Sequence, residues 1–148
     1  MRQRWIGTLV VSLLAAGCGD PAGPGSLDLV VTTDKPEYSL RTDSIARVTL
    51  ANRSDGAVYL PMDSYLVYER LRDGEWQDAF AWFIVDGIGR SFRLEAGATL
   101  TDELQVPFYL AGRPGTYRFR YFVYADSRVR FLLPVEQRVS QPVVVRQD

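Results

Sequence analysis

Few side chains in this chain of 148 residues could catalyse a reaction or bind a metal, and the residue type most often used for both is absent. The sequence contains no histidine, which removes Ser-His-Asp and Cys-His catalysis, most zinc sites and the commonest acid–base group near neutral pH. Ser44, Ser64 and Ser91 therefore have no general base to activate them. We expect a protein that is not an enzyme and that needs no cofactor.

The carboxylates could bind a metal or transfer protons, but their spacing favours neither. Asp102 and Glu103 could supply half of an acid–base pair. Four other aspartates could contribute to a calcium site: Asp63, Asp73, Asp86 and Asp126. Calcium needs six or more oxygens from a defined loop, and the D-x-D-x-D-G spacing of such loops is absent from the sequence. We expect no metal site.

Cys18 is the only cysteine, and the residues before it suggest a different chemistry. Residues 1–4 are a short basic start, and Trp5–Ala16 is a mostly apolar run that ends in small residues. This order is typical of a secretory signal. The run is too short to span a membrane, which takes about 20 apolar residues.

The segment Leu14–Cys18 resembles the signal of bacterial lipoproteins, in which the cysteine thiol is acylated and becomes the new N-terminus. That family usually has leucine three residues before the cysteine, where this chain has Ala15. The resemblance implies a signal peptide over residues 1–17 and a lipid on Cys18. It places the chain in the cell envelope, with the outer membrane preferred over the inner one. Gly19–Ser26 is rich in Gly and Pro, which predicts a flexible tether reaching about 15–25 Å.

Sixteen of the 17 basic residues are arginine. Four of them form two pairs in which one residue separates the two arginines. Arg118 and Arg120 share one side of a predicted strand, and Arg128 and Arg130 share one side of another. If those strands pair, the four guanidinium groups would form an anion-binding face for an acidic glycan, lipid head groups or an acidic protein. The alternative is a solvated face neutralised by acidic residues of neighbouring strands: Glu69, Glu75, Asp102 and Glu103.

The segment Ala79–Val85 is the longest apolar run after the signal. Trp82 and Phe83 within it could anchor a protein partner, because exposed aromatic residues are typical of binding hot spots. The other interpretation, which we favour, is a central strand buried on both faces.

The length and composition of the chain after the signal predict one domain with a small net charge. Removing residues 1–17 leaves 131 residues, enough for a single domain that buries about two-thirds of its unfolded surface. Arg2 and Arg4 leave with the signal, so the net charge becomes −3. A nucleic-acid partner would require a strongly basic domain, so we expect none. We expect a monomer.

Short stretches with a period of two, separated by turn residues, run from Leu27 to Arg146 and predict an antiparallel β-sandwich. Asp73-Gly74 predicts a type I′ hairpin turn. The predicted strands are Leu27–Thr32, Ser44–Ala51, Ala57–Leu60, Tyr65–Leu71, Glu75–Phe80, Phe92–Leu94, Thr99–Val106, Thr116–Tyr124, Arg128–Leu133 and Gln141–Arg146. On the strand beginning at Thr116, the residues expected to share one face are Tyr117, Phe119, Tyr121 and Val123.

Val31–Tyr38, followed by Val48–Asp55, resembles the opening of bacterial immunoglobulin-like domains found on envelope lipoproteins. The later stretches that match the pattern in order are Tyr68–Arg70, Asp73–Trp76, Leu94–Gly97 and Pro114–Arg118. The resemblance covers most of residues 28–124 and implies an immunoglobulin-like sandwich over residues 27–148. It also implies that Tyr117 is a corner tyrosine, with its ring buried and its hydroxyl bonded to nearby backbone.

The chain is similar as well to the bacterial intracellular proteinase inhibitor family, which shares the sandwich and the proline-rich opening. Phe80–Arg90 and Asp126–Arg138 depart from the pattern, and function resides in such grafted segments rather than in the fold. Our leading hypothesis is a lipid-anchored, non-enzymatic module that binds an envelope or secreted protein. The alternative is a proteinase inhibitor, with one of the two segments as its inhibitory loop.

Overall fold

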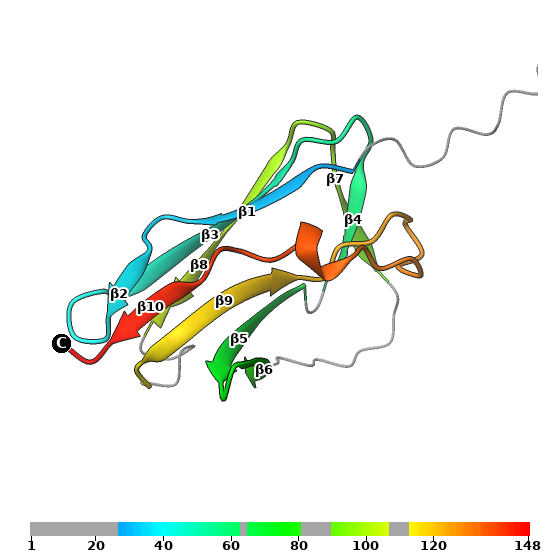
Figure 1. The fold of residues 1–148 in the computed structure, drawn as a ribbon. Coiled ribbons are helices and arrows are strands. Elements are labelled where there is room, and N and C mark those ends of the chain that lie inside the picture. The colour runs from blue at the N-terminus through cyan, green and yellow to red at the C-terminus, as the bar shows by residue number, and fades with distance from the viewer. Residues whose placement is uncertain (1–26, 63–64, 81–89, 107–112) are drawn as a thin grey trace, which may run out of the picture.

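The computed structural model describes residues 27–62, 65–80, 90–106 and 113–148, and they form an all-β immunoglobulin-like sandwich (Figure 1). The predicted signal peptide, Cys18 and the tether lie outside the described residues, as do Trp82 and Phe83. The elements are β1 (Leu29–Thr33), β2 (Glu37–Ser39), β3 (Ile45–Asn52), β4 (Val58–Pro61), β5 (Leu66–Arg72), β6 (Glu75–Phe80), β7 (Ser91–Leu94), β8 (Thr99–Gln105), β9 (Gly115–Tyr121), a 3₁₀ turn η1 (Val135–Gln137) and β10 (Val143–Arg146).

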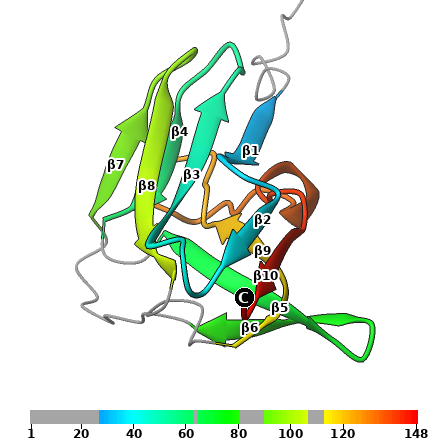
Figure 2. The ribbon, with the colours of Figure 1, turned by 90° about the vertical axis from the view of Figure 1, so that its left-hand side faces the viewer.

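Two main sheets face each other, and their strand orders are those of an immunoglobulin-like domain (Figures 1 and 2). One sheet has the order β1-β3-β8, which corresponds to strands A, B and E; the other has the order β2-β10-β9-β5-β6, which contains G, F, C and C′. Pairing is antiparallel except between β2 and β10, which run parallel. A small third sheet joins β4 to β7.

The hairpin between β5 and β6 confirms the turn predicted from Asp73-Gly74. Asp73 has φ 53° and Gly74 has φ 84°, so both central residues take the left-handed conformation that a type I′ turn requires. The turn fixes the register, with Arg72 opposite Glu75 and Leu71 opposite Trp76. This register determines which backbone groups of β6 face away from the sheet.

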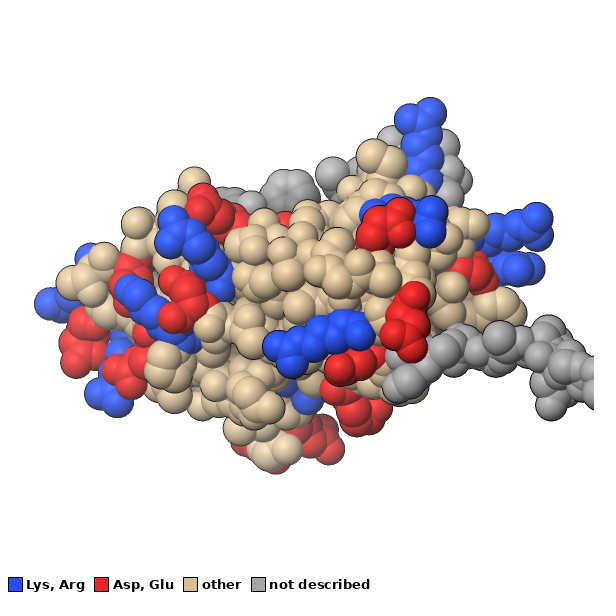
Figure 3. Space-filling model, turned by 90° about the horizontal axis from the view of Figure 1, so that it is seen from above, with Lys and Arg blue, Asp and Glu red and all other residues tan. Residues whose placement is uncertain are grey.

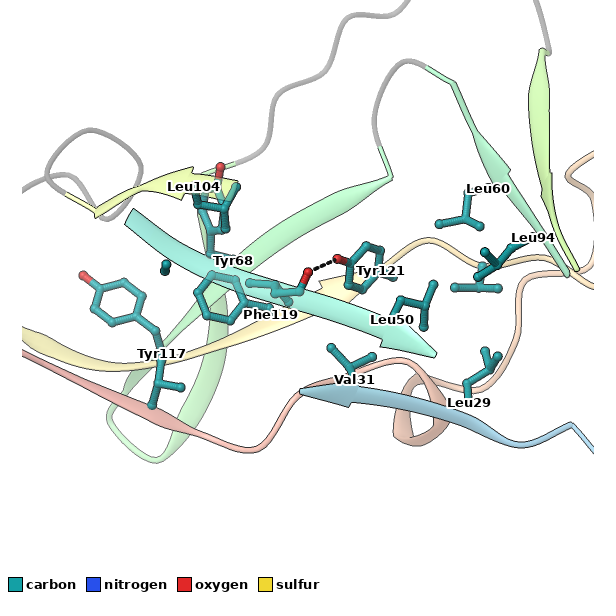
Figure 4. Close-up of a cluster of buried hydrophobic side chains, with 14 of the residues drawn as sticks. Leu29, Val31, Leu50, Leu60, Tyr68, Leu94, Leu104, Tyr117, Phe119 and Tyr121 are labelled. Atoms are coloured by element: carbon teal, nitrogen blue, oxygen red, sulfur yellow. Dashed lines mark hydrogen bonds between the residues drawn. The ribbon is translucent and has the colours of Figure 1, made fainter. Parts of the chain in front are cut away.

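The core lies between the two main sheets, where the inward side chains of alternating strands meet (Figure 4). On β3, Ala46, Val48 and Leu50 are buried, while Arg47 on the opposite face is exposed. From the facing sheet come the four residues that the alternation predicted to share one face, and all four are buried: Tyr117, Phe119, Tyr121 and Val123. Burial of these large side chains is the main favourable contribution to folding.

Tyr117 occupies the corner position that the resemblance implied. Its ring is buried, and its hydroxyl donates a hydrogen bond to the backbone oxygen of Arg113 at 2.9 Å. The side chain therefore holds the chain entering β9 against the core, which is a structural role.

Two predictions about the strands need correction, and one strand was not predicted. Arg128–Leu133 is not a strand, because this stretch folds as a turn and loop whose only ladder contact among the described residues is a single bridge between Leu132 and Tyr124. β9 ends at Tyr121 rather than at Tyr124. The short strand β2 was not predicted, because Pro36 reads locally as a break and the pairing partner, β10, lies about a hundred residues away.

Candidate functional site

The four arginines expected to share one face do not do so. Arg118 and Arg120 lie on the outer face of β9, whereas Arg128 and Arg130 lie in the loop that follows it. The predicted second strand does not form, so nothing aligns the two pairs. Seen from above, in Figure 3, acidic and basic side chains are interspersed, and no face of one sign is formed there.

Glu69, from β5, neutralises the first arginine pair. Arg118 Nε donates to Glu69 Oε2, and Arg120 Nε lies 3.2 Å from Glu69 Oε1. Arg120 Nη2 also contacts Asp78 Oδ1 at 2.9 Å across the hairpin to β6. Glu69 is only 5% exposed. The alternative interpretation, in which acidic residues of neighbouring strands neutralise the arginines, is therefore correct for Glu69. The guanidinium groups of Arg118 and Arg120 already have acidic partners.

Aromatic rings extend this ion-pair network into a layer over the outer face of the sheet. The Arg118 guanidinium lies 4.6 Å from the ring centroid of Trp76, and that of Arg120 lies 5.4 Å from that of Phe122. Arg138 is 4% exposed, donates to the backbone oxygens of Leu133 and Tyr121, and lies 5.8 Å from the Phe122 ring. Burial, with the nearby charge of Arg120, lowers the pKa of Arg138. The guanidinium groups of Arg118 and Arg120 thus have acidic partners in Glu69 and Asp78.

The second arginine pair belongs to a protruding loop, residues 126–133, whose backbone is fixed by Asp126. The Oδ1 atom of Asp126 accepts hydrogen bonds from the backbone N–H groups of Arg128 at 2.8 Å and Arg130 at 3.3 Å. Val129 between them has φ 49°, a conformation that is strained for a β-branched residue. Competition of the Asp126 side chain for backbone donors explains why this alternating stretch does not form a strand.

Asp102 on β8, which the sequence offered only for acid–base chemistry or for neutralising arginines, instead binds two tyrosines. Asp102 accepts hydrogen bonds from the hydroxyls of Tyr65 and Tyr121, each at 2.7 Å, one on each carboxylate oxygen. Burial, together with the Asp102 carboxylate, raises the pKa of both tyrosines. The sequence did hold the signal, since Asp102 alternates with Leu100 and Leu104 and so must face inward.

Strand β6 forms one edge of the five-stranded sheet, next to the arginine layer. Among the described strands, β6 pairs with β5 alone. In a two-residue hairpin the residues flanking the turn form a hydrogen-bonded pair, and non-bonded pairs alternate with bonded ones. The backbone N–H groups of Trp76 and Asp78 therefore point away from β5.

Neither a metal site nor a membrane span appears in the described part of the chain. There, no group of three or more His, Cys, Asp or Glu side chains is placed to hold a metal ion. Over the same residues, the structure has no helix with the length and apolar character needed to cross a bilayer.

Comparisons with known proteins add similar folds but no family. No protein-family model matches the chain, and no curated protein matches it. The alkylpurine DNA glycosylase AlkC of Pseudomonas fluorescens, bound to DNA containing an abasic site analog, is 13% identical with a TM-score of 0.42, covering 82% of this chain and 31% of that one. A PapD-like domain of human CEP192 is 15% identical with a TM-score of 0.37, covering 96% of this chain and 98% of that one.

A β-glucosidase of Erythrobacter marinus is also similar, at 14% identity and a TM-score of 0.38, covering 82% of this chain and 15% of the enzyme. The chain thus spans about a third of the glycosylase and a still smaller share of the glucosidase. Likenesses at these TM-scores carry no argument about function. The fold assignment comes from the strand orders of the chain itself.

Proposed function

We propose that this chain is a lipid-anchored, non-enzymatic immunoglobulin-like module of the bacterial cell envelope that binds another envelope or secreted protein. The main support for this protein contact is that β6 is an edge strand, with the backbone N–H groups of Trp76 and Asp78 directed away from the sheet. A partner segment in extended form would add to this edge through main-chain hydrogen bonds. Trp76, fixed by Arg118, would provide an aromatic anchor beside the added strand.

The chemistry of the described side chains supports binding rather than catalysis. Glu69 is occupied by two arginines, and Asp102 by two tyrosine hydroxyls. These groups hold the sandwich together, and their bonds would have to break before they could act on a substrate. Trp82 and Phe83 follow β6 in the chain and remain candidates for the same contact.

Substitutions at Asp78 test the edge contact with a matched control. Asp78→Pro removes the outward N–H, which an edge strand tolerates because that N–H makes no ladder bond. Asp78→Ala keeps the N–H and, like the proline variant, loses the carboxylate that contacts Arg120. A photo-crosslinking residue at exposed Gln77 should give a protein adduct in cells that persists in Asp78→Ala and disappears in Asp78→Pro. Equal adducts in both variants, or equal labelling from a probe at Thr101 on the other sheet, would contradict contact through this edge.

Cys18 tests the anchor independently of the partner. The mass of the exported protein should show an acylated Cys18 at its N-terminus, and membrane fractionation should place it in the outer membrane. Cys18→Ser should abolish the lipid and release the chain from that fraction. An unmodified cysteine, or a serine variant that fractionates like the parent, would contradict the lipoprotein proposal.

The proteinase inhibitor alternative is less well supported by the geometry. The loop of residues 126–133 is fixed by Asp126, as an inhibitory loop would be. However, the left-handed Val129 interrupts the extended backbone that lets a peptide bind by strand addition. Inhibition of a serine, cysteine or metalloprotease by the purified chain would overturn this ranking.

A further inference from the structure

The loop of residues 126–133 presents two large apolar side chains to solvent. Phe131 is 62% exposed and Leu132 is 42% exposed, and they are adjacent in sequence. Phe131 is the most exposed of the large apolar residues in the described part of the chain. Exposed apolar side chains clustered on one protruding loop are typical of a contact with another apolar phase.

Basic side chains flank this apolar pair. Arg128 is exposed, and the Arg130 guanidinium lies 5.3 Å from the ring centroid of Phe131. The ion pair of Arg130 with Asp126 is long, at 3.7 Å, and the arginine side chain is 57% exposed. The guanidinium groups of Arg128 and Arg130 are thus more accessible to anions than those of Arg118 and Arg120. Aromatic and leucine side chains beside arginines are the composition of segments that lie in the interface of an anionic bilayer.

The loop is held in place, so its side chains are presented without a large loss of entropy on binding. Asp126 binds the backbone at Arg128 and Arg130, and the Ser91 hydroxyl donates to the backbone oxygen of Ser127 at 2.9 Å. The Ser91 bond ties the loop to β7, so the loop is fixed to the sandwich from a second direction. A pre-organised loop binds more tightly than a mobile one with the same contacts.

The position of the loop in the domain identifies what it faces. Figure 1 shows the start of β1 and this loop (orange) at one end of the sandwich, while the C-terminus lies at the other end. The predicted tether of eight residues reaches about 15–25 Å from the lipid on Cys18. β3 alone, with eight residues, is about 27 Å long, so a tether of that reach would hold the end of the sandwich that carries the start of β1 and this loop nearest the membrane.

We propose that Arg128, Arg130, Phe131 and Leu132 form a membrane-contacting foot, which docks the sandwich on a phospholipid bilayer with anionic head groups. The proposal rests on the proposed lipid anchor and deepens it. The lipid on Cys18 would tether the domain without fixing its orientation, and an apolar and basic patch would supply a second contact with the bilayer. With the foot on the bilayer, the orientation of the domain is fixed and its opposite end, with the C-terminus, points away from the lipid.

Spin labels on the lipidated protein in vesicles test the foot. A label at Leu132→Cys is compared with one at Val144→Cys, a residue of similar exposure, 40%, on β10. In vesicles of phosphatidylethanolamine and phosphatidylglycerol, the Leu132 label should gain access to oxygen and lose access to an aqueous nickel chelate. The Val144 label should stay in water, and both should stay in water when phosphatidylcholine replaces the anionic lipid.

Charge variants supply the matched control. Arg128→Gln with Arg130→Gln should weaken docking of the foot about 25-fold at low salt, since each basic residue near an anionic surface contributes roughly a factor of five. Arg146→Gln removes an exposed arginine at the other end of the domain and should leave docking unchanged. Salt at about 1 M, where the Debye length is about 3 Å, should reproduce the effect of the double substitution.

The outcomes separate the foot from the anchor. If mass spectrometry shows lipid on Cys18 but the Leu132 label stays as accessible to nickel as the Val144 label, the foot is overturned and the anchored binding module remains. A protein without lipid on Cys18 overturns the anchor, and the foot with it. Protection of the Leu132 label in cells but not in vesicles would assign the loop to a protein partner and overturn membrane docking.

Discussion

Tyr121 and Asp102 connect the two sheets of the sandwich through a 2.7 Å hydrogen bond from the tyrosine hydroxyl to the aspartate Oδ2. The tyrosine comes from β9 and the aspartate from β8, so the bond crosses the core. The same hydroxyl lies 3.2 Å from the backbone oxygen of Val48 on β3. Tyr65 binds the other carboxylate oxygen, and its ring stacks on that of Tyr121 with centroids 6.1 Å apart. A half-buried carboxylate therefore joins the two sheets.

Asp102→Ala should destabilise the domain by about 2 to 3 kcal/mol, because the part-buried Tyr65 hydroxyl loses its acceptor and the Tyr121 hydroxyl keeps only the longer contact with the backbone oxygen of Val48. The expected fall in melting temperature is about 10 °C for a domain of this size. Glu103→Ala is the matched control, since Glu103 is the next residue, its side chain is 54% exposed and it pairs only with Arg47 at the surface. That control should change stability by less than about 1 kcal/mol. Equal effects of the two substitutions would show that the Asp102 bonds contribute little.

The same cluster predicts loss of stability at alkaline pH. The folded-state pKa values of Tyr65 and Tyr121 are raised above the ordinary value of about 10, because burial and the Asp102 carboxylate oppose ionisation. The unfolded chain loses these protons first, so it binds fewer protons than the folded chain above that pH. The free energy of unfolding should be unaffected below pH 10 and fall above it by about 1.4 kcal/mol per pH unit for each tyrosine.

Urea titrations between pH 8 and pH 11 measure this dependence. Tyr121→Phe removes one titrating group and should make the decline above about pH 10 shallower by about 1.4 kcal/mol per pH unit. Its stability at pH 8 should be lower than that of the parent, because one hydrogen bond is lost. An unchanged slope in the phenylalanine variant would mean that Tyr121 ionises as easily in the folded state as in the unfolded one.

Glu69→Gln should cost about 3 kcal/mol, because Arg118 and Arg120 would keep their charge on a largely covered face without their shared partner. Glu103→Gln breaks an ion pair of the same type, with Arg47, at the exposed surface. It should cost less than about 1 kcal/mol. Urea unfolding of the two variants beside the parent measures the difference. Two small and equal losses would mean that the aromatic contacts of the arginines, rather than Glu69, hold this layer.

Where the sequence predicted the fold well, local signals and tertiary structure agree. Asp73-Gly74 has only one favourable turn geometry between two alternating stretches, and the structure takes it. The alternation through Tyr117, Phe119 and Tyr121 identified the inward face of β9 because each of these large rings needs burial. Such positions can be predicted since the same residues determine the local conformation and the packing.

The predictions failed where a distant or competing partner decides the structure. The stretch Arg128–Leu133 alternates like a strand, but the Asp126 side chain takes the backbone donors that a strand would use. Taking Asp102 and Glu103 together as half of an acid–base pair overlooked that adjacent strand residues face opposite sides, so only Asp102 faces the sandwich. No local pattern could show that Tyr65 and Tyr121 would converge on it, because strand order alone brings them together.

Val129→Asn should stabilise the domain by about 1 kcal/mol, because asparagine tolerates the left-handed conformation that costs a β-branched residue roughly 1–2 kcal/mol. Val144→Asn is the matched control, since Val144 lies in β10 with extended backbone and should be destabilised by loss of β propensity. Thermal unfolding of both variants should give melting temperatures that move in opposite directions. A fall in both would mean that the contacts of the Val129 side chain outweigh the strain of its backbone. Because Asp126 fixes the same turn, Val129→Asn should leave the presentation of Phe131 and Leu132 unchanged.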